Sequence, residues 1–287
     1  MSEKTRPLFG PGGNSKRFFD EGHKSTAEAA KWLFENGLDA YEYQGGNGIH
    51  GGAGTFGKIG SLMRENGIAV SLHAPYFISL SSTEPEKRDK SIEYIEQSVD
   101  AAGWLGAHTI VIHCGSCAKI SREEATALSK DTLLRAVDRL SEKLEKHAVR
   151  LGIETMGKIN QLGTLDEVLD ICSVDKRLRP VVDFGHLNAR EGGLFFGPDD
   201  YKRVFDSIGE KLGGGEADDL HCHFSKIEFT QGGEKRHLTF ADTVFGPRFE
   251  PLMETVARYG YTPTLICESD GTMADDALLM KRYYETL

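Results

Sequence analysis

Histidine and acidic residues recur at the ends of short apolar runs in this sequence, and this spacing is its first sign of chemistry. The runs are rich in β-branched residues, as strands are, and each ends on a side chain that can bind a metal ion. These terminal residues are His73, His113, Glu154, Asp183, His221 and Glu268. Imidazole nitrogens and carboxylate oxygens without thiolate suit Zn, with Mn or Fe as alternatives at some positions.

Strand alternation strengthens this interpretation, because residues two apart on a strand point to the same side. In five of the runs the residue two before the terminal donor is small or apolar: Ser71, Val111, Gly152, Val181 and Ile266. That is the pattern of a packed floor beneath a polar site. A buried polar network without metal would have to satisfy three histidines and three carboxylates internally, at a large desolvation cost. We therefore favour a metal centre.

Further donors follow in the segments after the runs. His186 lies three residues after Asp183, and Gly185 between them lets the backbone turn back sharply. Glu234 and His237 lie before the last run. These donors exceed what one tetrahedral ion needs, which predicts two or three ions per chain. His223 is expected to face the same way as His221, as a satisfied polar residue or as a substitute ligand.

The elements that must position these residues alternate along the chain as strands and helices. Strands are predicted at Leu8-Gly10, Ala40-Tyr43, Ala69-Ala74, Thr109-His113, Arg150-Thr155, Pro180-Phe184, Asp219-Phe224 and Pro263-Glu268. Helices are predicted at Thr26-Asn36, Thr55-Asn66, Lys87-Gly106, Arg122-Val149, Leu165-Cys172, Pro198-Ile208, Arg248-Tyr259 and Ala274-Thr286. Eight such units without a linker predict one (β/α)8 barrel over residues 1–287, in which the strand ends converge on one mouth. The segment Gly10-Pro11-Gly12-Gly13 is a poor match to the phosphate loop of the competing doubly wound sheet.

Composition limits the partners. The formal net charge of -10 argues against non-specific coating of nucleic acid, although bound divalent cations would reverse the field locally. No apolar run is long enough to cross a bilayer, and the N-terminus has no signal-peptide core. The five cysteines are scattered along the chain and odd in number, which favours reduced thiols over a disulfide framework. We expect a cytoplasmic monomer without an obligate protein partner.

Several motifs together resemble the endonuclease IV family of apurinic/apyrimidinic endonucleases, over nearly the whole chain and in the right order. They are His73-Ala74-Pro75-Tyr76, Ile112-His113-Cys114-Gly115-Ser116, Ile153-Glu154-Thr155, Val182-Asp183-Phe184-Gly185-His186, His221 with Ser225-Lys226, and Arg236-His237. The resemblance implies a trinuclear Zn cluster at the mouth of the barrel. It also implies a damaged double-stranded DNA substrate, cleaved 5' to an abasic site.

The resemblance also assigns roles. By motif it gives His73, His113 and Glu154 to one ion, Glu154, Asp183, His221 and Glu268 to a second, and His186 and His237 to a third. Glu154 would also orient the attacking water as the catalytic residue. Tyr76 and Phe77 correspond to bulky side chains that invade the base stack, with packing at the mouth as the alternative. Lys226 and Arg236 are candidate phosphate contacts.

Two departures from the family pattern stand out. The family has an aspartate two residues before the last histidine of the third site, where this chain has Lys235 and the nearest carboxylate is Glu234. Either a shift of one residue lets Glu234 bind, which we favour, or the third site is altered. The loop after the second strand, at 44–52, is glycine-rich and nearly uncharged, whereas the family has arginine and tryptophan there.

Two other classes of function remain open. Related barrels that isomerise or epimerise sugars use one metal, on a set like Glu154, Asp183, His221 and Glu268, and move protons with carboxylates. The uncharged loop favours this class, whereas the added histidines favour the endonuclease. A non-enzymatic binding protein is the third reading, supported only by the altered third site.

Overall fold

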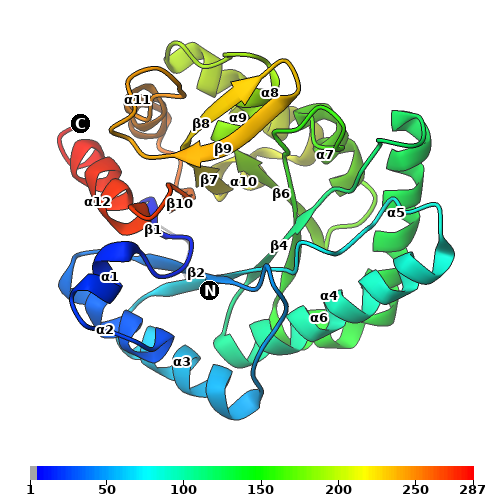
Figure 1. Ribbon diagram of the computed structural model, residues 1–287, viewed down its shortest axis with the longest axis horizontal. Coiled ribbons are helices and arrows are strands. Elements are labelled where there is room, and N and C mark those ends of the chain that lie inside the picture. The colour runs from blue at the N-terminus through cyan, green and yellow to red at the C-terminus, as the bar shows by residue number, and fades with distance from the viewer. Residues whose placement is uncertain (1–4) are drawn as a thin grey trace.

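The apolar, β-branched runs fold into eight parallel strands that form a barrel with the helices outside it (Figure 1). The computed structural model describes residues 5–287, so part of the expectation about the N-terminus, on residues 1–4, lies outside the described residues. The strands are β1 (Leu8–Pro11), β2 (Ala40–Gln44), β3 (Ala69–His73), β4 (Thr109–His113), β5 (Arg150–Glu154), β6 (Leu178–Asp183), β7 (His221–Phe224) and β10 (Thr264–Cys267). The predicted (β/α)8 barrel is confirmed.

The barrel closes between its first two strands. Neighbouring strands follow the order β1-β10-β7-β6-β5-β4-β3-β2, which leaves β1 and β2 to meet. Backbone hydrogen bonds of 2.9 Å join Asp39 N to Phe9 O and Gly13 N to Glu42 O. The two strands approach so closely that a Cβ on Gly10 would lie 1.8 Å from the carbonyl oxygen of Ala40. Only glycine fits at that position.

The helices follow the predicted amphipathic stretches, with local signals at their ends. They are α1 (Lys16–Asp20), α2 (Thr26–Glu35), α3 (Ala53–Glu65), α4 (Pro85–Leu105), α5 (Arg122–Arg139), α6 (Ser141–His147), α7 (Leu165–Cys172), α8 (Phe184–Arg190), α9 (Pro198–Leu212), α10 (Gly214–Asp218), α11 (Glu250–Tyr259) and α12 (Met273–Tyr284). Capping boxes start α2 at Ser25 and α7 at Thr164. The predicted helix Arg122-Val149 is divided at Leu140, and α1, α8 and α10 are short helices that the pattern does not predict. None of the helices in residues 5–287 has the length and apolar character of a membrane span.

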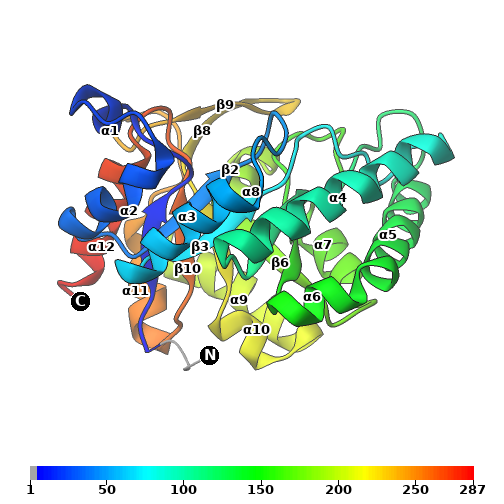
Figure 2. The same ribbon diagram turned by 90° about the horizontal axis from the view of Figure 1, so that it is seen from below.

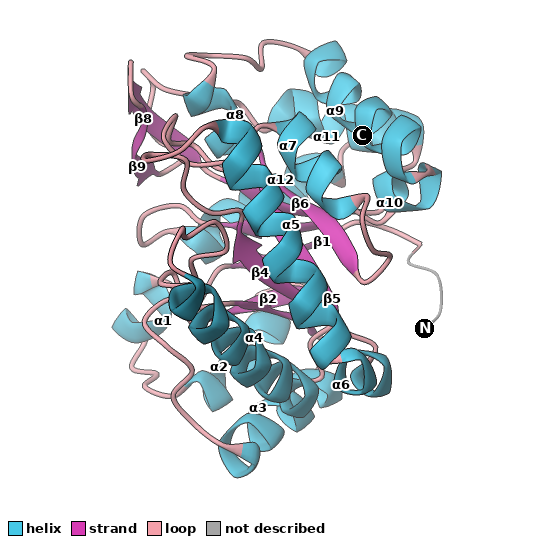
Figure 3. Cartoon of the chain, turned by 90° about the vertical axis from the view of Figure 1, so that its right-hand side faces the viewer, coloured by secondary structure: helices cyan, strands magenta, loops and turns pink. Residues whose placement is uncertain are grey.

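An antiparallel hairpin lies outside the barrel, in a segment for which no strand is predicted. Its strands are β8 (Lys226–Thr230) and β9 (Gly233–Leu238). Figure 2 shows the hairpin at the end of the barrel opposite to the start of β1, and Figure 3 shows it standing apart from the barrel strands. The loop after β5 holds it, since Glu234 N donates to Gly157 O at 3.0 Å. The hairpin therefore borders the end where the parallel strands finish.

Candidate metal centre

The ends of β3, β4 and β5 bring two imidazoles to one carboxylate. Nε2 of His73 and Nε2 of His113 lie 3.4 and 3.3 Å from Oε2 of Glu154. This oxygen is buried and accepts no hydrogen bond. Nδ1 of His73 lies 2.8 Å from the carbonyl oxygen of Ala74, which can only accept, so in the neutral ring the proton is on Nδ1 and Nε2 is free to bind a metal. The three ligand atoms suit one ion.

The same glutamate belongs to a second group with β6, β7 and the residue after β10. One ligand atom from each of Glu154, Asp183, His223 and Glu268 lies within 4.8 Å of the others. Nδ1 of His223 is 2.9 Å from Oε1 of Glu154 and 3.5 Å from Oε2 of Glu268. Oδ2 of Asp183 is buried without a hydrogen-bond partner. Glu154 thus presents one oxygen to each group, as a bridging ligand does.

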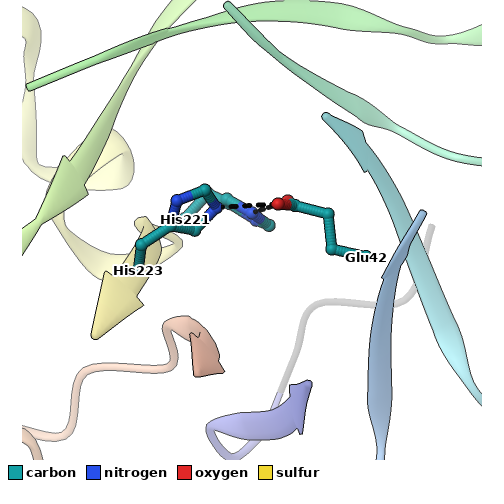
Figure 4. A group of neighbouring side chains, drawn as sticks. All are labelled: Glu42, His221 and His223. Atoms are coloured by element: carbon teal, nitrogen blue, oxygen red, sulfur yellow. Dashed lines mark hydrogen bonds and ion pairs between the residues drawn. The ribbon is translucent and has the colours of Figure 1, made fainter. Parts of the chain in front are cut away.

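The structure brings His223, and not the expected ligand His221, into this second group. In the sheet His223 pairs with Asp183, whereas His221 pairs with Val181, one inward layer deeper in the barrel. His221 instead points its Nε2 to Oε2 of Glu42 at 3.0 Å (Figure 4). Strand alternation could have predicted His223, because on the other strands the donor is the inward-facing residue nearest to the end of the strand.

A third group joins α8 to the hairpin. Asp183 caps α8 by accepting a 2.8 Å hydrogen bond from His186 N, which fixes the first turn of the helix and brings His186 over the mouth. Nε2 of His186 lies 3.5 Å from Oε2 of Glu234, and Nε2 of His237 lies 3.9 Å from its Oε1. Gly185 was expected to allow a sharp backbone turn, but the structure needs glycine there for its small size. A Cβ on residue 185 would lie 2.6 Å from the carbonyl oxygen of Ser225.

A β-bulge explains how Glu234 reaches this group. Along the hairpin Glu228 pairs with Arg236 and Phe229 with Glu234, so Lys235 has no partner across the ladder. The extra residue puts Glu234 and His237 on one face although they are three residues apart. Of the two readings of this site, the geometry fits the one-residue shift.

The carboxylates and imidazoles of the centre shift one another's ionisation. Burial opposes the charge on His186, but Asp183 and Glu154 outweigh it and raise the pKa of His186 to about 9. Burial likewise acts against the charge of His223, yet Glu268, Glu42 and Glu154 raise its pKa well above the usual value. Burial raises the pKa of Asp183. In the metal-free protein, protons therefore supply positive charge where cations would bind.

The aromatic residues after β3 lie differently from each other. The Tyr76 ring stacks beside His113, with centroids 5.3 Å apart, and meets His73 edge-on at 5.0 Å. It is 54% exposed and lines the same cavity as the first and third groups. Phe77 packs edge-on against Tyr94 of α4, with centroids 4.6 Å apart. Tyr76 therefore borders the metal groups, whereas Phe77 packs against α4.

The two candidate phosphate contacts, Lys226 and Arg236, lie in different places. Lys226 Nζ donates to the carbonyl oxygens of Phe240 and Asp242, so its charge is held against the backbone. It lines a cavity away from the metal groups. Arg236 lines the mouth with His237 but donates from Nε to Glu228 at 2.7 Å.

Two adjoining cavities open at the centre. A cavity of about 390 Å³ is lined by the first and third groups together with Met156, Lys158 and Gln161. A second cavity of about 840 Å³ shares Tyr76 and other residues with it and extends under the loop after β2. A ligand on the metal groups would therefore reach that neutral, glycine-rich loop.

Glu42 is the buried residue that sequence reasoning missed. It lies mid-strand in β2 with no exposed surface, and Ala40, Glu42 and Gln44 share one face of the strand. A carboxylate on the inward face of a barrel strand was the available signal.

The comparisons with known proteins agree with the barrel fold. The family model for xylose isomerase-like TIM barrels matches residues 30–283. An uncharacterised protein of Methanocaldococcus jannaschii is 33% identical over 218 residues, 76% of this chain and 78% of its own length. A probable endonuclease 4 of Acholeplasma laidlawii is 32% identical over 156 residues, which is 52% of each chain.

Solved structures with the same fold belong to proteins named for different activities. Endonuclease IV from Thermus thermophilus superposes with a TM-score of 0.68 at 17% identity, over 98% of this chain and 100% of that one. A D-tagatose 3-epimerase-like protein superposes with a TM-score of 0.67 at 19% identity, over 97% of both chains. These likenesses show the fold, while the sequence relatives and the family match confirm the resemblance seen in the motifs. This chain belongs to the xylose isomerase-like TIM barrel family.

Proposed function

We propose that this chain is a metal-dependent phosphodiesterase of the endonuclease IV type that cleaves damaged double-stranded DNA 5' to abasic sites, leaving a 3'-hydroxyl. The observation that carries the proposal is that five donors line one cavity together with Glu154 and Glu268 of the second group: His73, His113, His186, Glu234 and His237. A single-metal sugar enzyme would leave these five donors without a task. Three ions, with Zn favoured by the nitrogen and oxygen donors, would use them all.

The residues of the centre fit the parts of such a reaction. Bound divalent ions would supply Lewis acidity at the phosphate and at the departing oxygen. Glu154, which faces both groups with its two oxygens, is placed to orient the attacking water. Tyr76 offers an exposed ring beside the centre. A base could stack on this ring, or the ring could fill the gap left by an extruded nucleotide.

The DNA partner sets the expected charge balance. Lys158 and Arg236 are cations that line the mouth, in a chain whose formal net charge is -10. Binding would thus depend on the bound ions more than on a basic surface. We expect the enzyme to act as a monomer in the cytoplasm, where its five free cysteines stay reduced.

The test is incision of a duplex oligonucleotide that carries one abasic analogue. The wild-type protein loaded with Zn²⁺ should cut on the 5' side of the analogue and leave a 3'-hydroxyl. Chelator-treated protein and Glu154→Gln serve as controls and should not cut. If the loaded wild-type protein shows no metal-dependent cutting, the proposal is wrong.

A sugar isomerase or epimerase is the second candidate. It is favoured by the four donors Glu154, Asp183, His223 and Glu268, which would suffice for one ion, and by the neutral loop over the larger cavity. Elemental analysis separates the candidates, since about three ions per chain support the nuclease and about one supports the sugar enzyme. His237→Ala adds a second criterion, because it should abolish strand cutting but leave ketose epimerisation intact.

A further inference from the structure

A buried carboxylate lies directly beneath the second metal group. Glu42 is wholly buried, and its Oε2 accepts hydrogen bonds from Ser71 Oγ at 2.8 Å and from His221 Nε2 at 3.0 Å. Its Oε1 accepts a hydrogen bond of 3.3 Å from Gln44 Nε2. Strands β2, β3 and β7 therefore fix both oxygens of this carboxylate.

The same carboxylate touches the histidine that faces the metal group. Oε1 of Glu42 lies 3.0 Å from Nε2 of His223, an ion pair without the alignment of a straight hydrogen bond (Figure 4). On the opposite edge of the ring, Nδ1 of His223 faces Glu154 and Glu268. The imidazole is thus held between a carboxylate below and the metal ligands above.

We propose that Glu42 is a positioning residue for the metal centre, which keeps the proton of His223 on Nε2 and presents Nδ1 to the ion held with Glu154, Asp183 and Glu268. A carboxylate behind a ligating imidazole fixes its tautomer and orientation and raises its basicity. His221 and Ser71 complete the arrangement by holding Glu42 itself. The inference rests on the metal centre of the proposed function and not on its DNA substrate.

An ion held by Glu42, His221 and His223 themselves is the competing explanation, because their ligand atoms also lie close together. The contacts favour positioning. Each oxygen of Glu42 already meets two donor groups, and a metal would have to displace them. The two explanations predict different metal contents for variants of His221.

The experiment compares Zn²⁺ and Co²⁺ binding by wild-type, Glu42→Gln and Glu42→Asp proteins. Binding is measured by equilibrium dialysis with elemental analysis, and the Co²⁺ absorption spectrum reports the ligand field. Asp39→Asn is the matched control, because Asp39 is a buried carboxylate next to the same strand that pairs with Arg6 and Lys281 instead. Unfolding of the metal-free proteins shows whether each variant folds.

Glu42→Gln should bind one ion per chain about 10- to 100-fold more weakly, with an altered Co²⁺ spectrum, while the other ions and the control are unchanged. Glu42→Asp keeps the charge and should recover part of the affinity. If Glu42→Gln fails to fold, the Zn²⁺ affinity of Glu42→Asp decides, since binding of every ion with wild-type affinity would overturn the inference.

Two other results would also overturn it. Glu42→Gln could fold and bind every ion as the wild type does. Alternatively, His221→Gln, which keeps a donor to Glu42, could lose one ion outright, as expected if the lower group holds an ion of its own. A wild-type protein that binds no metal at all would instead refute the proposed function, so the two failures are distinguishable.

Discussion

Gly157 controls the third metal group through the space beside Glu234, and its replacement by alanine tests that group. A Cβ at Gly157 would lie 2.6 Å from Cβ of Glu234, 2.9 Å from its Oε2 and 3.1 Å from Cδ2 of His186. The closest of these contacts is with a Cβ, which the backbone fixes, so rotation of the Glu234 side chain cannot relieve it. The hairpin must move away from the loop after β5.

The expected cost follows from that overlap. Forcing an extra carbon into a packed site costs about 1–3 kcal/mol. If the movement separates Glu234 from His186, the cost falls on the metal-bound form, and each 1.4 kcal/mol is tenfold in affinity. Gly157→Ala should therefore bind the third ion about 5- to 150-fold more weakly, with the ions at Glu154 retained.

Equilibrium dialysis against Zn²⁺ gives the affinity for the third ion. Urea unfolding of the chelator-treated protein gives the loss of unfolding free energy that Gly157→Ala causes without metal. Gly54→Ala is the control, because Gly54 is exposed in α3 and a Cβ there has nothing within 4 Å. It should raise the unfolding free energy by up to ~1 kcal/mol and leave metal binding unchanged. Three ions bound by Gly157→Ala with wild-type affinity would refute the geometry of the third group.

Three further results are expected. Deleting Lys235 removes the bulge but leaves Glu234 two residues before the histidine, so elemental analysis should still find the third ion, whereas Glu234→Gln should lose it. The pKa of Asp39 is lowered, because Arg6 and Lys281 outweigh the opposing effect of burial. The ionised Asp39 therefore stabilises the folded protein above the pKa of an unfolded aspartate, about 3.9, and this stabilisation is lost as pH falls through the pKa of Asp39 in the folded protein. Asp39→Asn should therefore destabilise the protein to urea more at neutral pH than near pH 3, and equal loss at both would contradict the ion pairs. Removing metal with a chelator should lower Tm by roughly 2–4 °C per kcal/mol of binding free energy lost, and an unchanged Tm would argue against binding to the folded state.

The barrel strands could be predicted because they are short runs separated by amphipathic helical stretches, and six of the eight runs carry a metal-binding residue at or near the end. The predicted strand Thr109-His113 coincides with β4, and the other barrel strands differ from prediction by a few residues at most. The hairpin was not recognised in the same way, because Ile227 and Phe229 are the only large apolar residues in β8 and β9 is mostly charged or polar, so neither strand is an apolar run. Nothing in the sequence marks the break at Leu140, where neither glycine nor proline stands.

The site was predicted as a set but not in every member. The choice between His221 and His223 depends on strand register, which pairs His223 with Asp183 and which a single strand does not reveal. Glu42 was missed because only the closing of β2 against β1 and β3 brings its carboxylate under β7. Both points depend on contacts between distant segments, whereas the remaining donors could be placed from local pattern alone.

The dependence of the third group on the hairpin has a consequence for metal exchange. The donors of the first two groups stand on strands of the barrel sheet or directly after one, among the most buried parts of the fold. Two of the three donors of the last group stand instead on a two-stranded ribbon, and such ribbons are marginally stable alone. An ion bound there would be released when the ribbon lifts, so we expect it to be the last to load and the first to leave during slow depletion.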